Sequence, residues 1–165
     1  MSHTWLMDLL LAWQTHDQIK LPAGVDPETL LQFESKHSVE IPEDLRQFLL
    51  ATNGMGSRDM TDNEHYSFLP LEEWKPVVGG DIKDPFVYHL FGRFFIFCDF
   101  LIGSELYAIS LAPGRPHFVV CLTWNRQATI RRVANSFQEF VELYRRDQLF
   151  QSESIGIHFD PHYSG

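Results

Sequence analysis

The side chains best suited to chemistry lie near the carboxyl terminus. His158, Asp160 and His162 place two imidazoles and a carboxylate within five residues of one another. Imidazole and carboxylate groups are ligands of divalent metals, so this cluster would hold a metal ion if the terminus folded back on the domain. The same residues also suit a short mobile tail. We favour the tail and predict no metal or cofactor site.

A second polar cluster precedes an expected strand. His65 is close in sequence to Asp62, Glu64 and Ser67, and residues of these types can transfer protons. A polar loop in front of a strand explains the same residues without catalysis. We favour the loop.

Two further patterns are weak catalytic signals. Cys98-Asp99 falls in an apolar run without a histidine beside it, whereas a nucleophilic cysteine needs a neighbour that stabilises its thiolate. Gly54-Met55-Gly56 follows an expected helix, whereas phosphate-binding loops precede one. The sequence therefore predicts a protein that is not an enzyme.

The chain of 165 residues is acidic, and its charge is unevenly distributed. It carries 13 Lys and Arg against 22 Asp and Glu, a formal net charge of −9 with histidine neutral. Residues 26–73 hold eleven of the acidic and three of the basic residues, a net charge of −8. Binding to nucleic acid depends on Lys and Arg that neutralise phosphates, so direct nucleic-acid binding is disfavoured. The acidic segment is either a well-solvated helical surface or a docking face for a cationic protein.

Helical periodicity and capping residues predict four helices, over residues 4–13, 26–38 and 42–52 and from residue 136 to about 147. Asp26 suits an N-cap before Pro27, and Ser136 with Glu139 forms a capping box. Gly54 tolerates a left-handed backbone, so Asn53-Gly54 is expected to end the third helix in a Schellman-type cap.

The middle of the chain changes to an extended pattern. Candidate strands span residues 66–71, 94–100, 105–111, 118–124 and 129–133, with a weaker candidate at 86–90. Gly103 supplies a tight turn, and the connections are short, so neighbouring strands should be antiparallel. The sequence predicts an α+β fold, a mostly antiparallel sheet of about five to six strands with N-terminal helices and a C-terminal helix packed on it.

The length suits one compact domain without disulfides or a metal. We expect a helix and linker over 1–24, the main domain over 25–148 and an irregular tail over 149–165. Cys98 and Cys121 lie in apolar runs without metal-binding spacing, which indicates reduced thiols and a cytoplasmic protein. No membrane span is expected, because the apolar run from Trp5 to Trp13 falls well short of about 20 residues. No signal peptide is expected, because Asp8 interrupts that run and no Lys or Arg precedes it. The oligomeric state stays open.

Three blocks of the chain resemble the SMI1/KNR4 family, the founding group of the SUKH superfamily. They are a helix with Leu30, Phe33 and Glu34, the stretch 41–54 from Ile-Pro to Asn-Gly, and the stretch 133–140. The resemblance covers about residues 26–144, although Ile41 replaces the family's usual leucine and Asn135 a common acidic residue. Its signature residues are structural: Pro42, Phe48, Asn53, Gly54, Gly103, Ser136, Phe137, Glu139 and Phe140.

The resemblance implies a binding protein with no catalytic set. Bacterial members of the family are associated with neutralising polymorphic toxins, and fungal members with cell-wall and signalling regulation. We therefore expect an immunity-type module whose acidic surface covers a basic toxin domain, and the alternative is a regulatory or scaffold domain of a host pathway. The candidate partner-binding residues are Asp59, Asp62, Glu64, Glu72, Glu73 and Trp74. Trp74 is expected to be an exposed anchor or else a lid over the sheet edge.

Overall fold

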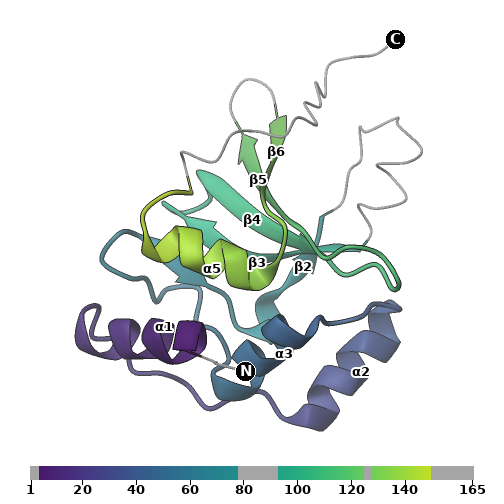
Figure 1. Cartoon of the computed structure of the whole chain (residues 1–165), viewed down its shortest axis with the longest axis horizontal. Coiled ribbons are helices and arrows are strands. Elements are labelled where there is room, and N and C mark those ends of the chain that lie inside the picture. Colours follow the sequence, from purple (N-terminus) through teal and green to yellow (C-terminus); the bar gives the residue numbers. More distant parts are fainter. Residues whose placement is uncertain (1–3, 78–92, 125–127, 150–165) are drawn as a thin grey trace.

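An antiparallel sheet with helices packed on one of its faces forms the described part of the chain, residues 4–77, 93–124 and 128–149 of a computed structural model (Figure 1). The helices are α1 (Thr4–Thr15), α2 (Pro27–His37), α3 (Glu43–Ala51), the 3₁₀ turn η1 (Leu71–Glu73) and α5 (Phe137–Arg145). The strands are β1 (Tyr66–Phe68), β2 (Lys75–Pro76), β3 (Phe94–Phe100), β4 (Glu105–Ser110), β5 (Val119–Trp124) and β6 (Ala128–Ala134). The predicted α+β fold is confirmed.

The sheet follows the chain order closely, as short connections require. Its strands lie in the order β1-β3-β4-β5-β6, every neighbouring pair is antiparallel, and β2 also pairs with β3. The strand expected over residues 66–71 is too long, because β1 ends at Phe68 and the chain then turns through Pro70 into η1. The weaker candidate at 86–90 lies outside the described residues.

The N-termini of α2 and α5 carry the predicted caps. The Asp26 carboxylate accepts from the N–H of Glu28 at 2.8 Å, and Pro27 begins α2. Ser136 Oγ accepts from the N–H of Glu139 at 3.0 Å, while the Glu139 carboxylate accepts from the N–H of Asn135 at 3.2 Å. The capping box of α5 is therefore present, with the return bond one residue before the N-cap.

The expected Schellman-type cap of α3 is wrong. Thr52 follows the helix in an extended conformation, with φ −157°. Gly54 does adopt a left-handed φ of +59°, but a Cβ there would lie 2.5 Å from the carbonyl oxygen of Phe68 and 2.6 Å from that of Leu69. Gly54 is thus required by the close approach of two backbone segments beside β1.

Two phenylalanines of α5 join the helices to the sheet. The Phe137 ring lies 6.0 Å from Trp5 of α1 and 4.9 Å from Phe48 of α3, centroid to centroid. Phe97 of β3 contacts both phenylalanines, with centroids 5.6 Å from Phe137 and 5.0 Å from Phe140. Figure 1 shows α5 lying across the sheet, with α1 and α3 beside it.

Helix α1 is part of the same core. Its residues Trp5, Leu6, Leu9 and Trp13 are buried in the main cluster, while Met7 and Leu11 remain exposed. Within the described ranges, no helix is both long enough and apolar enough to cross a membrane.

We predict that two glycine substitutions differ in cost because their surroundings differ. Gly114 has φ +70° with open space around it, so Gly114→Ala should cost only the left-handed strain, about 1–2 kcal/mol. Gly54→Ala adds a clash with two backbone carbonyls and should cost at least about 3 kcal/mol. Urea unfolding measures both, and equal losses would contradict this role of Gly54.

Candidate functional site

The segment from Met55 to Glu73, here called the acidic loop segment, carries most of the predicted partner-binding residues. It begins shortly after α3, lies against the residues that follow α1, and continues through β1 to η1. Met55 N donates to Phe68 O at 2.8 Å, and Asn63 bonds through its N–H to Asp17 at 2.9 Å and through its side chain to His16 O at 3.2 Å. The segment is therefore tied to the body of the domain along its length.

Asp62 holds the middle of this segment from inside. Its Oδ1 accepts from the N–H groups of Glu64 and Tyr66, both at 2.9 Å. Its Oδ2 accepts from the Tyr144 hydroxyl of α5, and that hydroxyl accepts from Trp13 Nε1 of α1 at 3.1 Å. The side chain is 5% exposed, so Asp62 is a framework residue, and its expected place on the binding surface is wrong.

Burial also sets the ionisation of this carboxyl. Removal from water raises the pKa of Asp62, and this outweighs the bonds from Tyr144, Tyr66 and Glu64, which favour the charged form. The residue binds a proton more readily in the folded protein than an exposed aspartate does.

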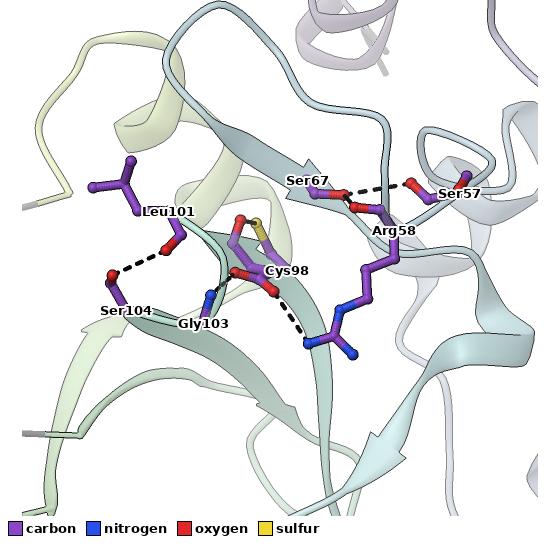
Figure 2. A network of polar contacts seen from close by, with 8 residues as sticks. Ser57, Arg58, Ser67, Cys98, Leu101, Gly103 and Ser104 are labelled. Carbon is purple, nitrogen blue, oxygen red and sulfur yellow. Dashed lines mark hydrogen bonds and ion pairs between the residues drawn. The ribbon is translucent and has the colours of Figure 1, made fainter.

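A second buried carboxylate, Asp99 of β3, joins the acidic loop segment to the β3–β4 turn. Figure 2 shows Arg58 of the segment and Gly103 of the turn, the two residues that Asp99 connects. Asp99 Oδ2 lies 3.5 Å from Arg58, and Asp99 Oδ1 accepts from the N–H of Gly103 at 2.6 Å. Ser67 Oγ donates to the carbonyl of Arg58 at 3.2 Å. This bond fixes the backbone of Arg58, whose side chain extends to Asp99. The turn and the loop segment therefore form one polar assembly.

Trp74 is not the exposed anchor that we expected. It is 7% exposed, its Nε1 donates to Leu69 O at 3.0 Å, and its ring lies 6.1 Å from Phe33 and 6.2 Å from Phe97. Packing against α2 and the sheet keeps the indole inside, which agrees with the alternative of a lid over the sheet edge.

Asn53 links the end of α3 to η1. Its Oδ1 accepts from the N–H of Leu71 at 2.8 Å, and its Nδ2 donates to Glu72 Oε2 at 2.9 Å. Beside it, a hollow of about 550 Å³ lies between α2 and η1, lined in part by Phe33, Lys36, Asn53, Glu72 and Trp74. Asn53 therefore fixes the position of η1, which forms one side of this hollow.

The exposed carboxylates of the acidic loop segment are Asp59, Glu64 and Glu72. Within the described residues, the carboxylates of Asp59 and Glu64 have neither a hydrogen-bond nor an ion-pair partner. Glu73 is half-buried, and its Oε2 has no hydrogen-bond partner within the described part of the chain. Asp59 and Glu64 therefore keep their charge available to a molecule outside the fold.

Other acidic residues between positions 26 and 73 have internal partners. Glu34 accepts from Arg46 at 2.7 Å and from the N–H of Ile41 at 3.0 Å. Asp44 accepts from the N–H of Gln138 at 2.8 Å and so caps α5 from α3. Part of the charge that the sequence places in this region thus stabilises the fold.

Within the described ranges, the side chains considered for catalysis are not arranged for it. Ser67 Oγ donates to backbone carbonyls, the Asp62 carboxylate is taken up by Tyr144 and backbone, and within these ranges neither bonds the His65 ring. Burial raises the pKa of the Cys98 thiol and raises that of Cys121 to about 12. No three His, Cys, Asp or Glu side chains of the described ranges are placed to hold a metal ion, and His158, Asp160 and His162 lie outside those ranges.

Two features escaped the sequence reasoning. Trp13 and Tyr144 meet Asp62 in the folded protein, and no local pattern in the sequence shows that they do. Leu101 and Ile102 are 44% and 99% exposed in the β3–β4 turn. The sequence does contain a sign of this exposure, because two large apolar residues occupy turn positions that are usually polar.

The sequence model of the SMI1 / KNR4 family (SUKH-1) matches residues 24–143. No curated protein matches the chain. The match includes α2, α3, the acidic loop segment and nearly all of α5, whereas α1 precedes it.

We predict a pH-dependent difference between the wild type and Asp62→Asn, which preserves the side-chain shape. The unfolded chain has an aspartate pKa of about 3.9, and burial raises the folded value. The stability of the wild type relative to Asp62→Asn should therefore be greatest below about pH 4 and decline as pH rises through the raised pKa. Urea unfolding across this range measures it, and a difference that grows with pH would contradict the assignment.

Proposed function

This chain belongs to the SMI1/KNR4 family (SUKH-1), and from that premise we propose that it is a non-enzymatic protein-binding module of the immunity type. It neutralises a toxin in the cytoplasm by binding a basic surface of the toxin through its acidic loop segment. Denying substrate access in this way needs no chemistry from the immunity protein.

The observation that carries the proposal is the pair of unpartnered carboxylates on a tethered loop. Asp59 and Glu64 are exposed, and within the described residues no cation neutralises them. A Lys or Arg of a partner can therefore pair with them without breaking an ion pair inside the fold. Because Asp62 and Asn63 already hold the loop, little conformational entropy is lost when the partner binds.

The overall charge supports the same role. A net charge of −9 attracts a cationic protein from a distance and raises the association rate. Screening by salt weakens such attraction between exposed charges, so binding should fall as ionic strength rises.

The decisive experiment pairs this protein with a toxin encoded beside its gene. The toxin domain, made as an inactive variant, is mixed with the purified protein, and the dissociation constant is measured at low and at physiological salt. A stoichiometric complex that is tighter at low salt supports the proposal. A neighbouring gene without a toxin domain, together with a constitutive endogenous partner, would overturn it in favour of the regulatory or scaffold alternative.

We predict that Asp59→Lys/Glu64→Lys weakens binding at least tenfold, about 1.4 kcal/mol, mainly through slower association. The control is Glu28→Lys/Glu43→Lys, an equal change of charge at exposed positions near the starts of α2 and α3. Surface plasmon resonance at two salt concentrations measures both. Equal weakening by the two double variants would mean that net charge, rather than the acidic loop segment, governs binding.

A further inference from the structure

The β3–β4 turn combines the most exposed apolar side chain among the described residues with an unfavourable backbone. Leu101, Ile102 and Gly103 are all left-handed, with φ of +50°, +53° and +83°. Ile102 is 99% exposed and Leu101 is 44% exposed. A β-branched residue adopts this conformation at an energetic cost. Within the described fold, the fully exposed side chain of Ile102 gains no packing that would offset this cost. Strain of this kind concentrates at functional positions.

The turn is held in place by its own polar contacts rather than left loose (Figure 2). Gly103 N–H donates to the buried Asp99 carboxylate at 2.6 Å, and Ser104 Oγ donates to Leu101 O at 2.9 Å. Leu101 N–H donates to His65 O at 3.2 Å, which attaches the turn to the acidic loop segment. The exposed side chain of Ile102 is therefore presented on a fixed backbone.

Acidic side chains accompany this apolar tip. Glu64 is exposed and adjoins His65, whose carbonyl accepts from the turn. Glu105, which begins β4 directly after the turn, instead accepts from the Tyr107 hydroxyl at 3.0 Å, so its carboxylate is not counted in this rim. Asp59 follows Arg58, the residue that pairs with Asp99 below the turn. The pattern is that of an interface, in which an apolar anchor projects from a charged rim.

We propose that Leu101 and Ile102 insert into an apolar pocket bordered by Lys or Arg on the basic partner. They are the anchor of the binding surface, the role that the buried Trp74 does not fill. This inference rests on the proposed function and adds which residues make the apolar contact. Because Asp99 and Ser104 already fix the turn, the partner gains the contact without ordering a loop.

The test replaces Ile102 by asparagine, a residue that tolerates the left-handed conformation. Since Ile102 is fully exposed, Ile102→Asn should keep or raise the melting temperature. The same variant should lower the affinity for the inactive toxin domain at least tenfold. The matched control is Leu31→Gln on α2, which removes a different exposed apolar side chain, 60% exposed, and should leave the affinity unchanged.

The possible outcomes separate this inference from the proposed function. If the wild type binds and Ile102→Asn binds equally well, the anchor is overturned while the proposed function stands. If the wild type does not bind the inactive toxin domain at low salt, the anchor and the proposed function are both overturned. If light scattering instead shows a wild-type dimer that Ile102→Asn converts to a monomer, the occupant is a second copy of this chain and the inference is wrong.

Discussion

The position of α5 is the constraint on which the other elements depend. Phe137 and Phe140 are fully buried where α1, α3 and the sheet meet, so a shift of α5 would disturb all three contacts. Ser136 and Asp44 satisfy the N–H groups at its start, and Asp44 does so from α3. Aromatic packing and capping therefore act together, because the caps fix the position of the helix that carries the two rings.

Two buried carboxylates, Asp62 and Asp99, connect this core to the surface loops. Burying a charged or polar group is unfavourable unless it is hydrogen-bonded, so Asp62 and Asp99 hold the backbone groups that they accept from. Asp62 connects the acidic loop segment to α1 and α5, and Asp99 connects it to the β3–β4 turn. The exposed residues Asp59, Glu64 and Ile102 are consequently displayed on a backbone with few alternative conformations.

Local signals predicted the elements well where a single segment decides the outcome. The strand over residues 94–100 has its expected bounds, and the capping residue Ser136 begins the last helix where it was expected. Both signals act over a few neighbouring residues. The errors occur where distant segments meet. Gly54 needs its conformation because Phe68 and Leu69 approach it, and Trp74 is covered by Phe33 and Phe97.

The sequence by itself determined the α+β class, the resemblance to the SMI1/KNR4 family and the excess of negative charge between residues 26 and 73. Composition and short-range periodicity are sufficient for the fold class and the charge, whereas the resemblance rests on the residues of the three matching blocks. Only the tertiary structure decided which carboxylates are framework and which are free. Asp62 and Glu64 are two residues apart, yet one accepts bonds from α5 and the backbone while the other faces water. The difference comes from desolvation by residues far away in the chain, which no local pattern encodes.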